Sequence, residues 1–152
     1  MIRYLEPIYK RAIDFLETDL GIELNSDFRG EFTSVSEIEL EDMSSIVALE
    51  GGFSCSVIIS AKKELCKVII QALLQAELND EEMNSCITEA ATEISNVIIG
   101  NVIGQFPEQG NNIELKPPVR ITKEDISVDE YEEILSNEIR TGYGVFRLYI
   151  AR

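Results

Sequence analysis

One stretch of the chain carries polar side chains at a spacing that brings them together on a helix. Glu89, Glu93 and Asn96 follow one another at intervals of four and three residues, so an α-helix would place them side by side on one face. No Lys or Arg occurs between Asp80 and Phe106, and Gly100 leaves the backbone bare beside Glu93 and Asn96, so another molecule could come close to this carboxylate and amide. The alternative interpretation is that both are ordinary solvated side chains.

The composition excludes most other catalytic chemistry. The chain has no histidine, so Ser-His and Cys-His nucleophile systems and histidine-ligated metals are excluded. Cys55, Cys66 and Cys86 are widely spaced and form no C-x-x-C pair, so they predict neither a disulfide framework nor a zinc site. The acidic cluster at 129–133 is interpreted as a solvated loop, because no D-x-D-x-D-G calcium loop occurs. We expect the chain to bind no metal and no cofactor of its own.

A long helix from 80 to 106 is expected to position the polar residues. Asn79 or Asp80 is expected to cap this helix, which should end near Phe106-Pro107. At about 100° per residue its apolar side holds Met83, Ile87, Ala90, Ala91, Ile94, Val97 and Ile98. The opposite side holds Glu89, Thr92, Glu93, Asn96 and Gly100, bordered by Gly104 on one edge and by Ile99 and Ile103 on the other.

Gly100 and Gly104 need an explanation, because a glycine inside a helix costs about 1 kcal/mol relative to alanine. One interpretation is that they allow the backbone of a partner to approach the exposed face. The other is that they admit a neighbouring element of the same domain. The spacing alone leaves both open.

The motif Glu89-x-x-x-Glu93-x-x-Asn96, continuing into Ile99-Gly100-Asn101, resembles the signature helix of the CheC/CheX/FliY family of bacterial chemotaxis phosphatases. Proteins of that family remove phosphate from the response regulator CheY. Their pattern is an acidic residue or serine, a Glu four positions later, an Asn three positions further, and a proline about twenty positions after that. Pro117 and Pro118 stand 21 and 22 positions after Asn96. The single motif copy resembles CheX, whereas CheC typically carries two, and Glu89 replaces the more usual Asp or Ser.

The resemblance implies a phosphatase that stimulates hydrolysis of the aspartyl phosphate of a CheY-like response regulator. Asn96 would orient the attacking water, because its neutral amide both accepts and donates hydrogen bonds, and Glu93 would dock to a lysine of the receiver domain. The other implied partner contacts are Glu89, Thr92, Gly100 and Ile103. Mg²⁺ is expected in the partner receiver domain. The alternative is a non-catalytic adaptor on the same scaffold that binds a receiver domain or a flagellar switch component.

Charge and hydropathy restrict the partners further. Thirteen basic and 28 acidic residues give a net charge of −15, which disfavours binding to nucleic acid or to an anionic membrane. No apolar run approaches the ~20 residues of a membrane span, and the N-terminus lacks the apolar core of a signal peptide. We therefore expect a cytoplasmic protein. CheX-like proteins pair edge strands, so a homodimer is also expected.

The order of predicted elements favours one α+β domain over residues 1–152, with a mostly antiparallel sheet and helices packed on one face. The expected helices are 7–20, stopped by Gly21, and 61–75, capped by Ser60. The expected extended segments are 29–40, a hairpin of 45–49 and 53–60 around Glu50-Gly51-Gly52, 113–116 after a turn at Gly110, 119–122, and a closing hairpin of 139–141 and 145–150. In the second strand of the first hairpin, Ser54, Ser56 and Ser60 should face outward. Residues 123–134 are predicted to be a surface loop.

Overall fold

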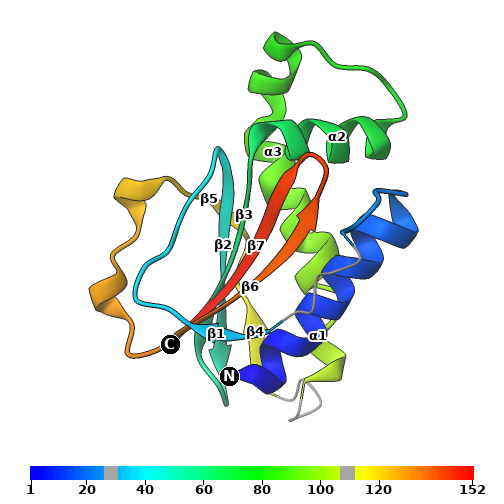
Figure 1. Cartoon of the computed structure of the whole chain (residues 1–152). Coiled ribbons are helices and arrows are strands. Elements are labelled where there is room, and N and C mark those ends of the chain that lie inside the picture. The colour runs from blue at the N-terminus through cyan, green and yellow to red at the C-terminus, as the bar shows by residue number, and fades with distance from the viewer. Residues whose placement is uncertain (26–30, 107–111) are drawn as a thin grey trace.

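The computed structural model describes residues 1–25, 31–106 and 112–152, which form one antiparallel sheet with helices packed on one of its faces (Figure 1). Seven strands in these residues pair in the order β1-β6-β7-β3-β2-β4, and β5 also pairs with β2. The strands are β1 Thr33–Ser34, β2 Met43–Gly51, β3 Cys55–Ala61, β4 Ile113–Leu115, β5 Val119–Arg120, β6 Ile134–Thr141 and β7 Gly144–Ala151. The predicted fold class is confirmed.

Both predicted hairpins are present. β2, β6 and β7 are longer than predicted, whereas β3 begins at Cys55 instead of residue 53. In the first hairpin, Val47 pairs with Val57, and the turn contains Gly51, whose φ of +128° disfavours any side chain. A Cβ at Gly51 would also lie 1.6 Å from the carbonyl oxygen of Asn112. The turn therefore requires glycine both for its backbone conformation and for the close approach of a neighbouring strand.

Three helices cover one face of the sheet: α1 Ile2–Ile13, α2 Lys63–Leu74 and α3 Asp80–Ile99 (Figure 1). The first begins earlier than predicted and contains Pro7 in its interior. Tyr4 and Leu5 are buried and the Tyr4 ring stacks on Phe53 at 4.1 Å, so burial of the first turn outweighs the hydrogen bond that Pro7 cannot donate. A π-helical turn, Asp14–Asp19, continues α1 before Gly21 at φ +68°.

The helix-facing side of the sheet follows the predicted alternation. Fully or almost fully buried residues of β3 and β7 pack against the helices: Cys55, Val57, Ile59, Phe146, Leu148 and Ile150. Side chains of period two on neighbouring antiparallel strands thus form one surface that the apolar sides of the helices cover.

The opposite face of the sheet is also covered, which corrects the predictions for residues 29–40 and for Ser60. Residues 31–42 contain only the two-residue strand β1, and the rest of this segment crosses the far face. Ser60 is therefore fully buried instead of facing solvent. Its hydroxyl lies 2.9 Å from Ser44 Oγ and accepts a hydrogen bond from the amide of Glu41 at 2.8 Å. It does not cap α2, whose N-cap residue is Lys62.

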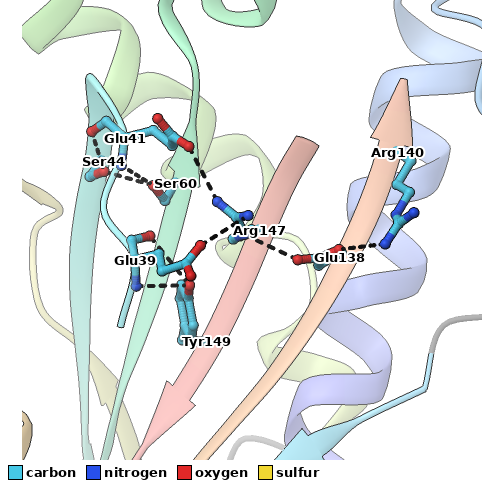
Figure 2. A network of polar contacts seen from close by, with 8 residues as sticks. All are labelled: Glu39, Glu41, Ser44, Ser60, Glu138, Arg140, Arg147 and Tyr149. Carbon is cyan, nitrogen blue, oxygen red and sulfur yellow. Dashed lines mark hydrogen bonds and ion pairs between the residues drawn. The ribbon is translucent and has the colours of Figure 1, made fainter. Parts of the chain in front are cut away.

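A polar network fixes the covering segment to the sheet (Figure 2). The guanidinium of Arg147 lies 3.0 Å from a carboxylate oxygen of Glu39, 3.3 Å from Glu41 and 3.1 Å from Glu138. The hydroxyl of Tyr149 accepts a hydrogen bond from the amide of Glu39 at 3.1 Å. Arg147 thus joins two carboxylates of the segment to one on β6.

Residues 123–134, predicted as a surface loop, contain two short 3-10 turns at Lys123–Asp125 and Val128–Glu130. Ile126 and Val128 pack with Leu40 on the far face. Among the described residues, none of the helices combines the length and hydrophobicity needed to cross a bilayer. The predicted start of the 29–40 segment and the predicted turn at Gly110 lie outside the described residues.

Candidate functional site

The helix that carries the polar motif begins where the sequence predicts. The side chain of Asn79 accepts a hydrogen bond from the amide of Glu82 at 2.8 Å, and the Asn79 amide donates to the Glu82 carboxylate at 2.9 Å. This capping box satisfies two amides that the first turn would otherwise leave unpaired. Asp80 in the same turn also forms an ion pair with Lys67 of α2 at 3.5 Å. The start of α3 is therefore held both by its own cap and by an ion pair with the neighbouring helix α2.

The apolar side of α3 faces the core, with two residues beyond those predicted. Met83, Ile87, Ala91, Ile94 and Ile98 are buried, whereas Ala90 and Val97 are half-buried. Ser95 and Ile99 are fully buried as well. Ile99 was expected on the border of the exposed face, so this prediction is wrong. The reason is that β2 and β5 cover the flank of α3 on which Ser95 and Ile99 lie.

The helix also ends earlier than predicted. The side-chain amide of Asn101 donates to the carbonyl oxygen of Val97 at 2.7 Å, which takes up an acceptor that a continuing helix would use. After Gly100 the chain turns inward, buries Val102 and Phe106, and forms a separate 3-10 turn at Ile103–Gln105. Ile103 is consequently half-buried, and neither it nor Gly104 belongs to the exposed face of α3.

The exposed face of α3 presents four of the predicted site residues. Glu89, Glu93, Asn96 and Gly100 are solvent-exposed, and Thr92 is half-buried. The hydroxyl of Thr92 donates to the carbonyl oxygen of Glu89 at 3.0 Å, so it is occupied within the helix. By contrast, the Glu93 carboxylate and the Asn96 amide form no hydrogen bond or ion pair with any described residue. Both remain available to another molecule.

Gly100 has a close neighbour within its own chain. A Cβ at this position would lie 2.6 Å from the backbone carbonyl oxygen of Asn96, to which the amide of Gly100 donates. Real Cβ atoms do not approach backbone so closely, so a side chain at Gly100 would displace the backbone of Asn96. Gly104 has no atom within 4 Å of such a Cβ among the described residues. The two glycines therefore differ in role.

Two polar contacts that the sequence did not predict hold one flank of α3. Ser95 Oγ lies 2.5 Å from Ser45 Oγ of β2. Arg120 of β5 donates to the hydroxyl of Thr88 at 3.1 Å and to the carbonyl oxygen of Asp42 at 3.3 Å. Since β5 directly follows Pro117 and Pro118, the segment after the two prolines lies beside the motif helix. Ser95 borders the apolar side in the helical pattern, which is the only sequence signal for these contacts.

None of the three cysteines is exposed: Cys55 and Cys66 are buried, and Cys86 of α3 is half-buried, with its thiol donating to the carbonyl oxygen of Met83 at 3.5 Å. Burial raises the pKa of the Cys55 and Cys66 thiols to about 12, so neither is a thiolate near neutral pH. No group of three or more Cys, Asp or Glu side chains in this part of the chain is arranged to hold a metal ion. What the face of α3 offers is a carboxylate, which can bind a charged group, and an amide, which can orient a water molecule.

The chain is similar in sequence and in structure to known chemotaxis proteins. A family model described as chemotaxis phosphatase CheX matches residues 43–138, which include α3 and both prolines. The CheY-P phosphatase CheX of Thermotoga maritima is 22% identical over 117 residues, covering 76% of this chain and 73% of that protein. The chemotaxis protein CheX from Desulfovibrio desulfuricans has a TM-score of 0.74 at 17% identity, covering 98% of this chain and 99% of that one. A chain of the CheX-CheY-BeF3-Mg²⁺ complex from Borrelia burgdorferi has a TM-score of 0.73 at 24% identity, and the match covers 97% of this chain and 96% of that one.

Proposed function

This chain belongs to the CheX family of chemotaxis phosphatases, since the family model spans residues 43–138, and from that premise we propose that it stimulates hydrolysis of the aspartyl phosphate on a CheY-like response regulator. The observation that supports this proposal most directly is the exposed pair Glu93 and Asn96, which stand one turn apart on α3 without partners among the described residues. The curated relative from Thermotoga maritima is named a CheY-P phosphatase.

Asn96 is the residue that orients the attacking water. A carboxamide can accept a hydrogen bond from water through its oxygen and donate one through its nitrogen. It carries no charge, so it adds no repulsion against the phosphoryl oxygens. Orienting one water contributes about 3 kcal/mol, or roughly a hundredfold in rate. This suits a protein that accelerates a reaction which the phosphorylated receiver already undergoes by itself.

Glu93 binds the receiver and so places Asn96. A carboxylate one turn before the amide can form a charge-assisted hydrogen bond with a lysine of the receiver. Glu89, Thr92 and Gly100 extend the contact along α3, and Ile103 adds a half-buried apolar contact beyond its end. Mg²⁺ belongs to the receiver in this proposal, so the present chain needs no cofactor. The solved Borrelia burgdorferi complex, which contains CheX, CheY, BeF3 and Mg²⁺, supports a receiver as the partner.

The test is the lifetime of a phosphorylated CheY-like receiver with and without this protein. The native protein should shorten the lifetime, and Asn96→Ala should lower the stimulated rate about a hundredfold while receiver binding stays nearly intact. Asn84→Ala is the matched control, because Asn84 is an exposed amide on the same helix outside the predicted site face. Full activity of Asn96→Ala would refute the assignment of this residue.

The same measurement separates the phosphatase from an adaptor. A non-catalytic adaptor that binds a receiver or a flagellar switch component would leave the phosphoryl lifetime unchanged or lengthen it. Native protein that binds the receiver without shortening this lifetime would therefore replace the proposed function with the adaptor.

We propose in addition that the protein is a homodimer formed through sheet edges. Along the outer edge of β6, β1 pairs with Ser136 and Leu135 and Leu24 bridges to Thr141. At the other edge of the sheet β4 has three residues. The short strands β1 and β4 are therefore edge strands among the described residues, with backbone groups that could pair with a second copy. Chromatography with light scattering should give twice the chain mass of 17.1 kDa. The mass of a single chain would contradict the dimer.

A further inference from the structure

The flank of α3 is held on the sheet by one cross-strand pair. Ser45 of β2 lies directly opposite Arg120 of β5. Ser45 contacts Ser95 at 2.5 Å, and Arg120 donates to Thr88 at 3.1 Å. The two contact points on α3 are seven residues apart, which is two helical turns. We call these four residues the α3 clamp.

The chemistry of the clamp is not what stability alone would select. Ser45 and Ser95 are fully buried, and their hydroxyls bond to each other inside a core that is mostly apolar on that side of the sheet, where Asn137 and Thr141 are the other buried polar residues among those described. Two small apolar residues of similar shape would be about as stable, because buried hydroxyls lose their hydration. Nε of Arg120 is also buried and has no hydrogen-bond partner among the described residues. A role other than stability should account for the two buried hydroxyls and the buried Nε.

This role is to fix the position and rotation of α3 on the sheet. Apolar contacts tolerate small shifts and rotations of a helix, whereas a hydrogen bond is sensitive to distance and direction. Ser95 directly precedes Asn96, so fixing Ser95 fixes the height and rotation of Asn96 above the sheet. The second contact, at Thr88, prevents α3 from pivoting about the first.

We propose that Ser45, Ser95 and Arg120 are positioning residues, which hold α3 in the one register that presents Asn96 correctly to the phosphoryl group. This inference rests on the proposed phosphatase function, although the clamp itself can be tested without it. A displacement of about 1 Å at a reacting group can lower a rate by up to a hundredfold. Binding is spread over a larger surface, so it should be much less sensitive.

The chain contains a matched control for this test. Ser44 and Ser60 are likewise fully buried and lie 2.9 Å apart between β2 and β3. They belong to the polar network on the opposite face of the sheet, where Figure 2 shows them beside Glu41. No hydrogen bond joins this pair to α3 within the described residues. Removing it perturbs the same sheet without releasing the motif helix.

The experiment compares Ser45→Ala/Ser95→Ala with Ser44→Ala/Ser60→Ala in the phosphorylated-receiver assay. The first double variant should lower the rate at saturating protein about tenfold, with the half-saturating concentration changed less than about twofold. The second should leave the saturating rate within about twofold of native. Arg120→Met, which releases the other contact, should act in the same direction as the first. Equal saturating rates in both double variants, whether native or reduced, would overturn the clamp.

Hydrogen exchange provides a readout that does not depend on the enzymatic activity. Amides of residues 88–99 should exchange about tenfold faster in Ser45→Ala/Ser95→Ala than in native protein, and at the native rate in Ser44→Ala/Ser60→Ala. If the native protein fails to shorten the phosphoryl lifetime, the proposed function is wrong and exchange alone decides the clamp. Unchanged exchange in the first double variant would overturn the clamp even if the phosphatase assay succeeds.

Discussion

Glu93 and Asn96 are neighbours on one exposed face, yet they differ in what they can contribute. The carboxylate carries a charge that acts on binding, whereas the amide acts through geometry and leaves the charge of the site unchanged. This division of roles predicts different kinetic consequences for substitutions at the two positions. It also explains why neither side chain is bonded to another of the described residues. Such an internal contact would have to break before the carboxylate or the amide could bind the receiver.

At the residue scale, Glu93→Gln should weaken binding of the phosphorylated receiver about tenfold, because it keeps the size of the side chain and removes the charge of a hydrogen bond worth about 1.5–3 kcal/mol. The half-saturating receiver concentration at low and high salt measures this. Native binding should weaken with added salt more than binding by the variant. Glu89→Gln, on the same face four residues earlier, is the control and should have a smaller effect. Equal salt dependence of native protein and Glu93→Gln would argue against an ion pair at this position.

At the element scale, Gly100→Ala should impair function through the backbone of Asn96. The added Cβ would lie 2.6 Å from the Asn96 carbonyl oxygen, so the last turn of α3 has to open. We expect thermal unfolding at a lower temperature and a stimulated rate reduced about tenfold, measured by calorimetry and by the phosphoryl lifetime. Gly104→Ala has open space around it and serves as the control. If alanine at both positions left stability and rate unchanged, the close approach at Gly100 would be irrelevant.

The elements also show which features sequence patterns can predict. Local patterns were enough to predict the capping box at Asn79, the two hairpins and which side of α3 faces the core, since each depends on residues close together in the chain. They failed where a distant segment decides the outcome. Ser60 is buried because residues 31–42 cross it, and Ile99 is buried because β2 and β5 cover its flank of α3. The contact between Ser45 and Ser95 joins residues 50 positions apart, which no periodicity encodes.

At the scale of the whole molecule, the sheet is covered on both faces while one side of α3 stays open. Helices cover one face, and residues 31–42 together with 121–131 cover the other (Figure 1). α3 itself is held by its cap, by its apolar side and by contacts with β2 and β5. Its remaining side carries the exposed motif. The surrounding fold thus places a rigid helix at the surface, which is what a docking and water-orienting function requires.

The buried thiols of Cys55 and Cys66 make the free energy of unfolding of the whole molecule sensitive to alkaline pH. Burial raises the pKa of the Cys55 and Cys66 thiols from 9.0 to about 12. Between these values the unfolded chain releases protons that the folded chain retains, so the free energy of unfolding should fall as the pH rises from about 9 to 12. Each thiol can contribute a slope of about 1 kcal/mol per pH unit. Below pH 9 the two thiols should cause no change.

Denaturant unfolding of native protein and Cys55→Ala/Cys66→Ala at several pH values between 7 and 11 tests this expectation. The variant should be less stable at pH 7, because it loses two buried sulfur atoms, but its stability should fall less steeply above pH 9. Part of the slope should persist at the most alkaline values, since burial also raises the pKa of Tyr9 to about 12. If the free energy of unfolding fell equally steeply with pH in both proteins, the buried thiols would not be the groups that couple folding to alkaline pH.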